Sequence, residues 1–180
     1  MNLNLRMKLA YAAPPRTGGR WWFDVLKTIG FVGDPERPET LTHRMNRPPG
    51  GYRVIASVRD PLTRFMGVYR WVLETRAGWG ALGSAASAGE DAFAEALFSR
   101  RGAAAASQVS MLESGRIDGL LRFEGDPRAQ AAQVGLVLPP AYPRVWAPKH
   151  DLPGEHAMSL VAKHWRDDFL FLKYKLPDDR

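Results

Sequence analysis

The sequence predicts an α/β fold in which helices pack in layers on a parallel sheet. Short runs rich in apolar and β-branched residues alternate along the chain with stretches of helical periodicity, which is the pattern of repeated strand–helix units. Two of these runs lead through a glycine- or proline-containing turn into a helix. The chain has 180 residues, 45% of them hydrophobic and 24% charged, and we expect a single domain over residues 1–180.

The first strand–helix unit occupies residues 7–30. The segment MKLAYA at 7–12 predicts a short strand, and the loop PRTGGR at 15–20 follows it. Apolar residues then recur at the spacing of one helix face, at Trp22, Val25, Leu26 and Ile29. Gly30 is a suitable helix stop.

The second unit begins with YRVIASV at 52–58, a run typical of a buried strand. Asp60 and Pro61 follow as an N-cap and a first-turn proline, which together predict a helix start. The apolar stripe of that helix comprises Leu62, Phe65, Met66, Tyr69, Val72 and Leu73.

The rest of the chain predicts three irregular segments, one further strand and four further helices. Proline-rich or small-residue composition predicts loops at 33–51, 78–89 and 139–153. The segment GLLRF at 119–123 predicts a strand. Helices are predicted at 91–100, at 103–114, after Asp126-Pro127, and at 155–166.

Composition excludes several classes of protein. The chain has no cysteine, so a disulfide framework, a thiolate metal site and a cysteine nucleophile are excluded. There is no apolar run of the length a membrane span needs and no secretory signal pattern at the start, so we expect a soluble, cytoplasmic protein. The four histidines and scattered carboxylates show no metal-ligand spacing, and we expect no metal.

Charge is distributed unevenly along the chain. The net charge is +6, and residues 1–80 hold 13 Lys and Arg against 6 Asp and Glu, whereas residues 81–180 hold 12 against 13. The positive half predicts an anionic partner, such as a nucleic acid, a phosphorylated cofactor or an acidic polysaccharide. No recognition-helix or RNA-binding motif accompanies the charge, so nucleic acid is the weaker choice.

The loop at 15–20 has the composition of an anion-binding turn. Gly18 and Gly19 allow a sharp turn, and the following helix start adds a positive dipole. Arg16, Thr17 and Arg20 add charge and hydroxyl donors. The first glycine and the Lys-Ser/Thr pair of a Walker A loop are missing. The alternative is an ordinary basic strand-to-helix turn.

Arg59 ends its predicted strand, at the edge where open α/β sheets bind ligands. That position favours anion binding, and pairing with a carboxylate such as Glu124 is the alternative. For Arg64 and Arg70 we expect a solvated helix face.

These segments together resemble the donor-binding motifs of the sulfotransferase superfamily. PPRTGGRWW at 14–22 is similar to the PKTGGT-like loop of the carbohydrate and cell-surface type, and VIASVRDPLTRFMGVYRW at 54–71 is similar to its RDPxxRxxSxYR-like segment. The likeness continues in order with LLRFE at 120–124 and with HWRDDFLFLKY at 164–174. It covers nearly the whole chain, most weakly in the middle.

The resemblance implies a P-loop-like three-layer fold, with a small central parallel sheet flanked by helices, that binds 3′-phosphoadenosine 5′-phosphosulfate (PAPS) as co-substrate. The family transfers the sulfuryl group from PAPS to a hydroxyl or amine, here by expectation a hydroxyl of a carbohydrate or glycoconjugate. By this likeness Arg16–Arg20 (Arg16, Thr17, Gly18, Gly19 and Arg20) would hold the 5′-phosphosulfate and Arg59 the 3′-phosphate. His43, the histidine between the two motifs, would be the acceptor base. Trp21, which is adjacent to the loop, is a further candidate for packing near the donor, although a role in core packing is the favoured alternative.

Two residues differ from the family pattern. Arg16 replaces the usual loop lysine, which keeps the charge but removes a proton donor. Gly67 replaces a serine that reaches the 3′-phosphate in the family. A non-catalytic anion- or glycan-binding relative and another P-loop nucleotide-dependent transferase therefore stay open as alternatives. Of the other histidines, His150 could belong to a lid, whereas His156 and His164 are expected at the surface or in packing.

Overall fold

The chain has a mixed α/β fold with a four-stranded, mostly parallel sheet and about eight helices, as seen in a computed structural model. The structure describes residues 2–33, 50–75, 78–100, 102, 104–112, 117–142 and 152–179. The chain divides into two compact units. Unit 1 comprises Met1–Arg59 and Ser110–Ala147, and unit 2 comprises Asp60–Val109 and Pro148–Arg180. The expectation of one domain over 1–180 stays a prediction.

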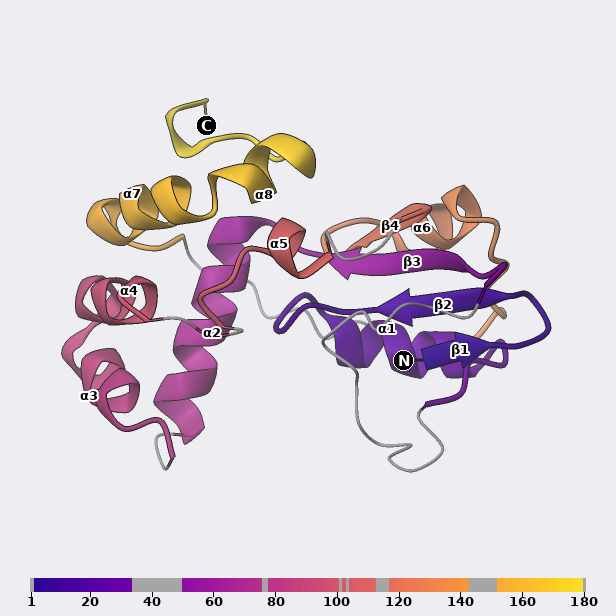
Figure 1. The fold of residues 1–180 in the computed structure, drawn as a ribbon, viewed down its shortest axis with the longest axis horizontal. Coiled ribbons are helices and arrows are strands. Elements are labelled where there is room, and N and C mark those ends of the chain that lie inside the picture. Colours follow the sequence, from indigo (N-terminus) through magenta and orange to yellow (C-terminus); the bar gives the residue numbers. More distant parts are fainter. Residues whose placement is uncertain are drawn as a thin grey trace. The chain divides into compact units, whose positions relative to one another are not determined.

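The sheet belongs to unit 1 and has the strand order β1-β2-β3-β4 (Figure 1). The strands are β1 (Asn2–Asn4), β2 (Leu9–Ala12), β3 (Arg53–Val58) and β4 (Gly119–Arg122). β2, β3 and β4 run parallel, which confirms the three predicted strands and their predicted direction. β1, which was not predicted, pairs with β2 in the antiparallel direction.

β1 is fastened to the segment that follows the first helix. Leu3 and Val32 exchange two backbone hydrogen bonds of 2.9 Å. The Asn4 side chain donates to the Ile29 carbonyl at 2.8 Å and accepts from the Met7 N–H at 2.9 Å. Both bonds satisfy amide groups that are buried at this edge of the sheet.

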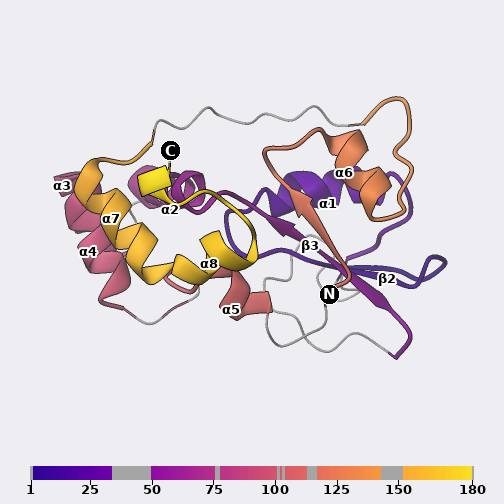
Figure 2. The ribbon, with the colours of Figure 1, turned by 90° about the horizontal axis from the view of Figure 1, so that it is seen from above.

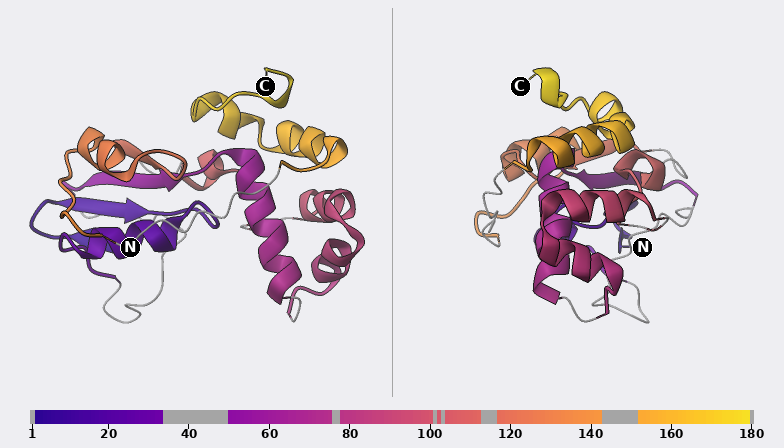
Figure 3. Two further views of the ribbon diagram at one scale, coloured as in Figure 1. Left: turned by 180° about the vertical axis from the view of Figure 1, so that it is seen from behind. Right: turned by 90° about the vertical axis from the view of Figure 1, so that its left-hand side faces the viewer.

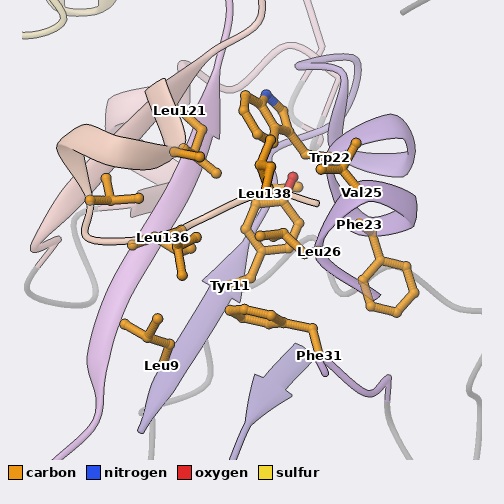
Figure 4. Packing of buried hydrophobic residues seen from close by; sticks show 14 residues of the cluster. Leu9, Tyr11, Trp22, Phe23, Val25, Leu26, Phe31, Leu121, Leu136 and Leu138 are labelled. Atoms are coloured by element: carbon orange, nitrogen blue, oxygen red, sulfur yellow. The ribbon is translucent and has the colours of Figure 1, made fainter. Parts of the chain in front are cut away.

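Two helices of unit 1, α1 (Gly19–Lys27) and α6 (Pro127–Gln133), cover the same face of the sheet (Figure 2). Side chains that alternate along the strands meet apolar residues of both helices and of the segment after α6 (Figure 4). The largest fully buried side chains of this core are those of Trp22, Tyr11 and Phe23. The predicted start of α6 is confirmed, because the Asp126 side chain accepts the Ala129 N–H at 2.7 Å.

Unit 2 is helical (Figure 3). Its first helix, α2 (Pro61–Thr75), starts as predicted, with the Asp60 carboxylate accepting the N–H groups of Leu62 and Thr63 at 3.0 and 3.1 Å. The others are α3 (Ala81–Ala88), α4 (Glu90–Phe98), α7 (Glu155–His164), α8 (Arg166–Phe171) and the 3₁₀ turn η1 (Pro177–Asp179). The longest described helix is α2, with 15 residues, and none of the described helices has the length and apolarity needed to cross a membrane.

Two predicted elements of the middle of the chain are corrected. The predicted loop at 78–89 is largely the helix α3, because alanine is the strongest helix former and two glycines with positive φ flank the helix, while Gly83 lies within it. Gly80 and Gly89 have φ values of 52° and 128°, which stop the helix on either side. Of the helix predicted at 103–114, the described residues form a turn at 104–106 and the short helix α5 (Gln108–Leu112), whereas 103, 113 and 114 lie outside the described residues.

Candidate functional site

The carboxyl ends of three parallel strands bring the predicted anion-binding residues to one edge of the unit 1 sheet. Ala12 pairs with Ala56, and Val58 pairs with Arg122, so these strands end at nearly the same level. The loop at 13–18 follows β2, Arg59 follows β3 and Phe123 follows β4. This is the edge at which open α/β sheets bind ligands.

The loop after β2 contains two residues in the left-handed conformation. Gly18 has φ 74° and ψ 16°, and Arg16 has φ 66°. A left-handed arginine is uncommon, and such conformations concentrate in ligand-binding turns. Gly18 is the N-cap of α1 and makes no side-chain cap hydrogen bond to the first turn of the helix. The loop therefore presents a positive helix end beside the exposed Arg16.

The Phe123 ring lies directly against Gly18. A Cβ atom at position 18 would overlap the ring carbons of Phe123, so the contact requires glycine for its space as well as for its φ. Phe123 also packs edge-to-face on Trp21, with ring centroids 6.4 Å apart. The half-buried Trp21 contacts Trp22 in turn, with centroids 4.8 Å apart. Trp21 thus packs among aromatic rings at the start of α1.

Arg59 contacts the same ring, that of Phe123. Its guanidinium carbon lies 4.6 Å from the centroid of Phe123, a cation–π contact, and the residue is 7% exposed. Phe123 therefore contacts both the loop after β2 and the arginine after β3. The structure brings together Gly18, Trp21 and Arg59 around one aromatic side chain.

Three hydroxyl groups lie in contact beneath the loop, and we call them the hydroxyl chain: Tyr11, Ser57 and Thr17. The Tyr11 hydroxyl is 2.9 Å from Ser57 Oγ, and Ser57 Oγ is 3.0 Å from Thr17 Oγ1. Thr17 Oγ1 donates to the Pro14 carbonyl at 2.7 Å. All three residues of the hydroxyl chain are fully buried. The hydroxyl of Thr17, which the sequence predicts as an anion donor of the loop, therefore points into unit 1.

Arg20 and Gly67, which the resemblance assigns to donor binding, belong to different units. Arg20 lies on the first turn of α1, largely exposed, with its Nε 3.7 Å from the Asp24 carboxylate. Gly67 is buried within α2 and belongs to unit 2, whereas the loop and Arg59 belong to unit 1. The predicted base His43 lies outside the described residues, as does His150.

The remaining histidines confirm the expectation of surface or packing roles. His156 Nε2 lies 3.1 Å from the Glu95 carboxylate, and both side chains are more than half exposed. The exposed His164 stacks on Phe98 with centroids 4.6 Å apart and an interplanar angle of 7°.

Arg64 is buried, whereas the sequence predicts that it lies on a solvated helix face. The residue is 0% exposed. Its Nη1 donates to the Ala106 carbonyl at 3.0 Å and lies 3.8 Å from Asp168 Oδ2, and its guanidinium stacks on the Trp165 ring at 4.3 Å. The reason is that α2 is buried around most of its first three turns, so the side opposite the apolar stripe is also covered. Arg70 is half-buried.

The partner of Arg64 is held by backbone donors. The Asp168 carboxylate accepts the N–H groups of Gln108 and Val109, each at 2.8 Å. Burial raises the pKa of Asp168, and these hydrogen bonds and Arg64 oppose the rise. Burial likewise lowers the pKa of Arg64 to about 10, with Asp168 opposing, so the guanidinium keeps its charge at neutral pH.

Sequence reasoning missed three residues of these arrangements: Phe123, Ser57 and Asp168. Phe123 follows a predicted strand at the same level as Arg59, so the positional argument used for Arg59 could have identified it. Ser57 is the one polar residue in the strand segment VIASV, which is itself a signal of a satisfied buried hydroxyl. Nothing local in the sequence connects Asp168 with Arg64.

Comparisons with protein families, with curated proteins and with solved structures found no match to this chain.

Proposed function

We propose that the chain is a PAPS-dependent sulfotransferase that transfers a sulfuryl group to a hydroxyl of a carbohydrate or glycoconjugate. The proposal rests on the resemblance of the ordered motifs. One observation supports it above the others: Phe123 contacts both Gly18 of the first motif and Arg59 of the second. A donor with two separated anionic groups needs two cationic subsites at one edge of a sheet. The P-loop-like three-layer architecture is part of the proposal.

The residues at this edge fit the two ends of the donor. The 5′-phosphosulfate would lie on the first turn of α1, where the helix start and Arg16 favour negative charge. Arg20 on the same turn would add a second cation, although it also faces Asp24. Arg59 would hold the 3′-phosphate with its planar, permanently charged guanidinium. Phe123 would keep that guanidinium in place by stacking.

Sulfuryl transfer develops negative charge on the oxygen that bridges the sulfur to the leaving phosphate. Fixed donors and cations aimed at that oxygen lower the barrier, as the helix start and Arg16 would do here. Arg16 cannot supply a proton, but the 5′-phosphate is a good leaving group that does not need one. His43 is proposed to accept the proton of the attacking hydroxyl, a contribution of roughly 10²–10⁴-fold.

A non-catalytic anion- or glycan-binding protein is the second candidate, and the arginine at position 16 favours it. Arg16 has a left-handed backbone, and its side chain is bulkier and forked compared with the lysine usual in the family. Such a site would bind the donor or its product without turning it over. An Arg16→Lys variant that gained turnover absent from the natural protein would identify the natural protein as a binder.

Calorimetric titration of the desulfated product, 3′-phosphoadenosine 5′-phosphate (PAP), tests the donor site. We expect saturable binding to the natural protein and a loss of about 10- to 100-fold in affinity for Arg59→Ala, the cost of one charged hydrogen-bonding group. Arg53→Ala is the matched control, since Arg53 is an exposed arginine at the opposite end of β3. No binding to the natural protein, or an equal loss in both variants, would reject the donor site.

Transfer of labelled sulfate from PAPS to a panel of glycans then separates an enzyme from a binder. Transfer that His43→Ala reduces by at least tenfold, at unchanged PAP affinity, would support His43 as the acceptor base. PAP binding without transfer to any acceptor would favour the second candidate.

A further inference from the structure

The hydroxyl chain beneath the loop has a fixed direction, because each hydroxyl group has one proton to donate. Thr17 donates its proton to the Pro14 carbonyl at 2.7 Å. In the 3.0 Å contact between Thr17 and Ser57 the donor must therefore be Ser57. Ser57 has then used its proton, and it accepts from Tyr11 at 2.9 Å. The order of donation runs from Tyr11 to Ser57, to Thr17 and to the Pro14 carbonyl.

The hydroxyl chain begins at Tyr11, a donor that stays protonated. Tyr11 is fully buried, and burial raises the pKa of its phenol above the ordinary value, so the hydroxyl stays neutral. The Tyr11 hydroxyl also lies 3.2 Å from the Gly19 carbonyl, in the first turn of α1. The one proton of Tyr11 goes to Ser57 at the end of β3, and the more distant Gly19 carbonyl at the start of α1 is an alternative acceptor for it.

We propose that Tyr11 and Ser57 are positioning residues that hold the loop after β2, at 13–18, in the conformation that binds an anion. This inference rests on the proposed function. None of the three hydroxyl groups is exposed, and each is occupied by another protein group, so they act through the loop rather than on a ligand. Ser57 precedes Arg59 by two residues on the same strand end. One strand therefore fixes both the loop and the arginine that would hold the other end of the donor.

The direction of donation predicts a graded series of effects. Thr17→Val removes the donor to Pro14 and the acceptor of Ser57, so it should loosen the loop most. Ser57→Ala breaks the tie between β3 and the loop, but Tyr11 can still donate to Gly19 and Thr17 to Pro14, so the fold should tolerate it. Tyr11→Phe leaves the bond from Ser57 to Thr17 intact and should have the smallest effect.

The experiment combines hydrogen exchange of the peptide that spans residues 14–22 with PAP titration of the same proteins. For Ser57→Ala we expect exchange about fivefold faster in this peptide and PAP affinity about fivefold lower, the equivalent of one buried hydrogen bond. Thr17→Val should exceed both values, and Tyr11→Phe should give about twofold changes. Thr17→Ser keeps the hydroxyl and should behave like the natural protein.

Thr28→Val is the matched control, because Thr28 donates to a backbone carbonyl at the other end of α1 and lies outside the hydroxyl chain. Unchanged exchange in Ser57→Ala, or equal effects of Thr28→Val and Thr17→Val, would overturn the inference. If the natural protein fails to bind PAP, the proposed function fails, and the exchange series alone then decides whether the hydroxyl chain holds the loop. Faster exchange with unchanged PAP affinity would overturn the link to binding.

Discussion

Arg59 and Arg64 are five positions apart in one motif, yet the structure places them in different units and different surroundings. Arg59 of unit 1 stacks on Phe123 beside a loop whose helix start has no side-chain cap. Arg64 of unit 2 is enclosed by a carboxylate, a backbone carbonyl and an indole ring. The first arginine lies at the edge where open α/β sheets bind ligands, and the second is enclosed by groups of its own unit.

The two units also bury polar groups by different means. Unit 1 uses the neutral hydroxyl chain, which costs little to bury because each hydroxyl is hydrogen-bonded. Unit 2 uses a charged pair, whose burial is expensive and is offset by backbone donors and aromatic stacking. Removing one hydroxyl should therefore cost about one hydrogen bond, whereas removing one charge leaves the other charge buried without its partner.

Breaking the charged pair should give the largest effect. Arg64→Ala leaves the buried Asp168 carboxylate without its cation and removes the stacking on Trp165, which should lower the free energy of unfolding by about 3–5 kcal/mol. Urea unfolding gives the stability, and hydrogen exchange should show the loss in peptides of unit 2. Arg70→Ala, on the same helix, is the control for charge and should cost about 1 kcal/mol or less. Equal losses in the two variants would contradict the distinct role of Arg64.

The next effect is expected at the loop of unit 1. Gly18→Ala places a Cβ against the Phe123 ring and forces alanine into a left-handed conformation, which together should cost about 2–4 kcal/mol. Thermal unfolding and PAP titration should both report the change. Gly78→Ala is a control for φ, since Gly78 has φ 98° and, among the residues that the structure describes, no atom beyond its chain neighbours lies within 4 Å of its Cβ position. A Gly18→Ala protein with natural stability would contradict the described contact.

A smaller change should separate the role of Phe123 from that of a simple core residue. Phe123→Leu keeps an apolar side chain but removes the ring face under Arg59, so we expect a stability loss of about 1 kcal/mol and a three- to tenfold loss of PAP affinity. Phe31→Leu, which changes a ring within the unit 1 core, should lower stability by a similar amount without weakening PAP binding. The prediction fails if both variants bind PAP equally well.

The smallest effect is a slope of stability with pH. Because burial raises the pKa of Asp168, the native state binds its proton more tightly than the unfolded chain does, and stability should decrease as pH rises from about 4. The hydrogen bonds from Gln108 and Val109 and the attraction of Arg64 oppose this, so the slope is shallow. Urea midpoints of the natural protein between pH 4 and 7 should fall relative to those of Asp168→Asn. A relative rise would mean that the pair's attraction outweighs burial.

Much of the fold follows from local signals, and much of the site does not. Strand–turn–helix units with clear caps, such as Asp60-Pro61 and Asp126-Pro127, were predicted correctly because the caps act on neighbouring residues. The alanine-rich segment of α3 was predicted as a loop because its small residues carry no periodic apolar pattern. The pairing of Arg64 with Asp168 and the contact of Gly18 with Phe123 join distant segments, which a single sequence does not relate.

The antiparallel strand β1 bears on the order in which unit 1 assembles. β1 and β2 are joined by a short turn, and Asn4 fastens them to the segment after α1, so these contacts close small loops. The parallel pairings of β2 with β3 and of β3 with β4 must close much longer ones and are slower to form. We therefore expect Asn4→Ala to slow folding more than Leu121→Ala does per unit of stability lost, as a φ-value comparison would measure. β1, the edge strand that the sequence did not predict, would then form with β2 the first hairpin, to which β3 and β4 are added.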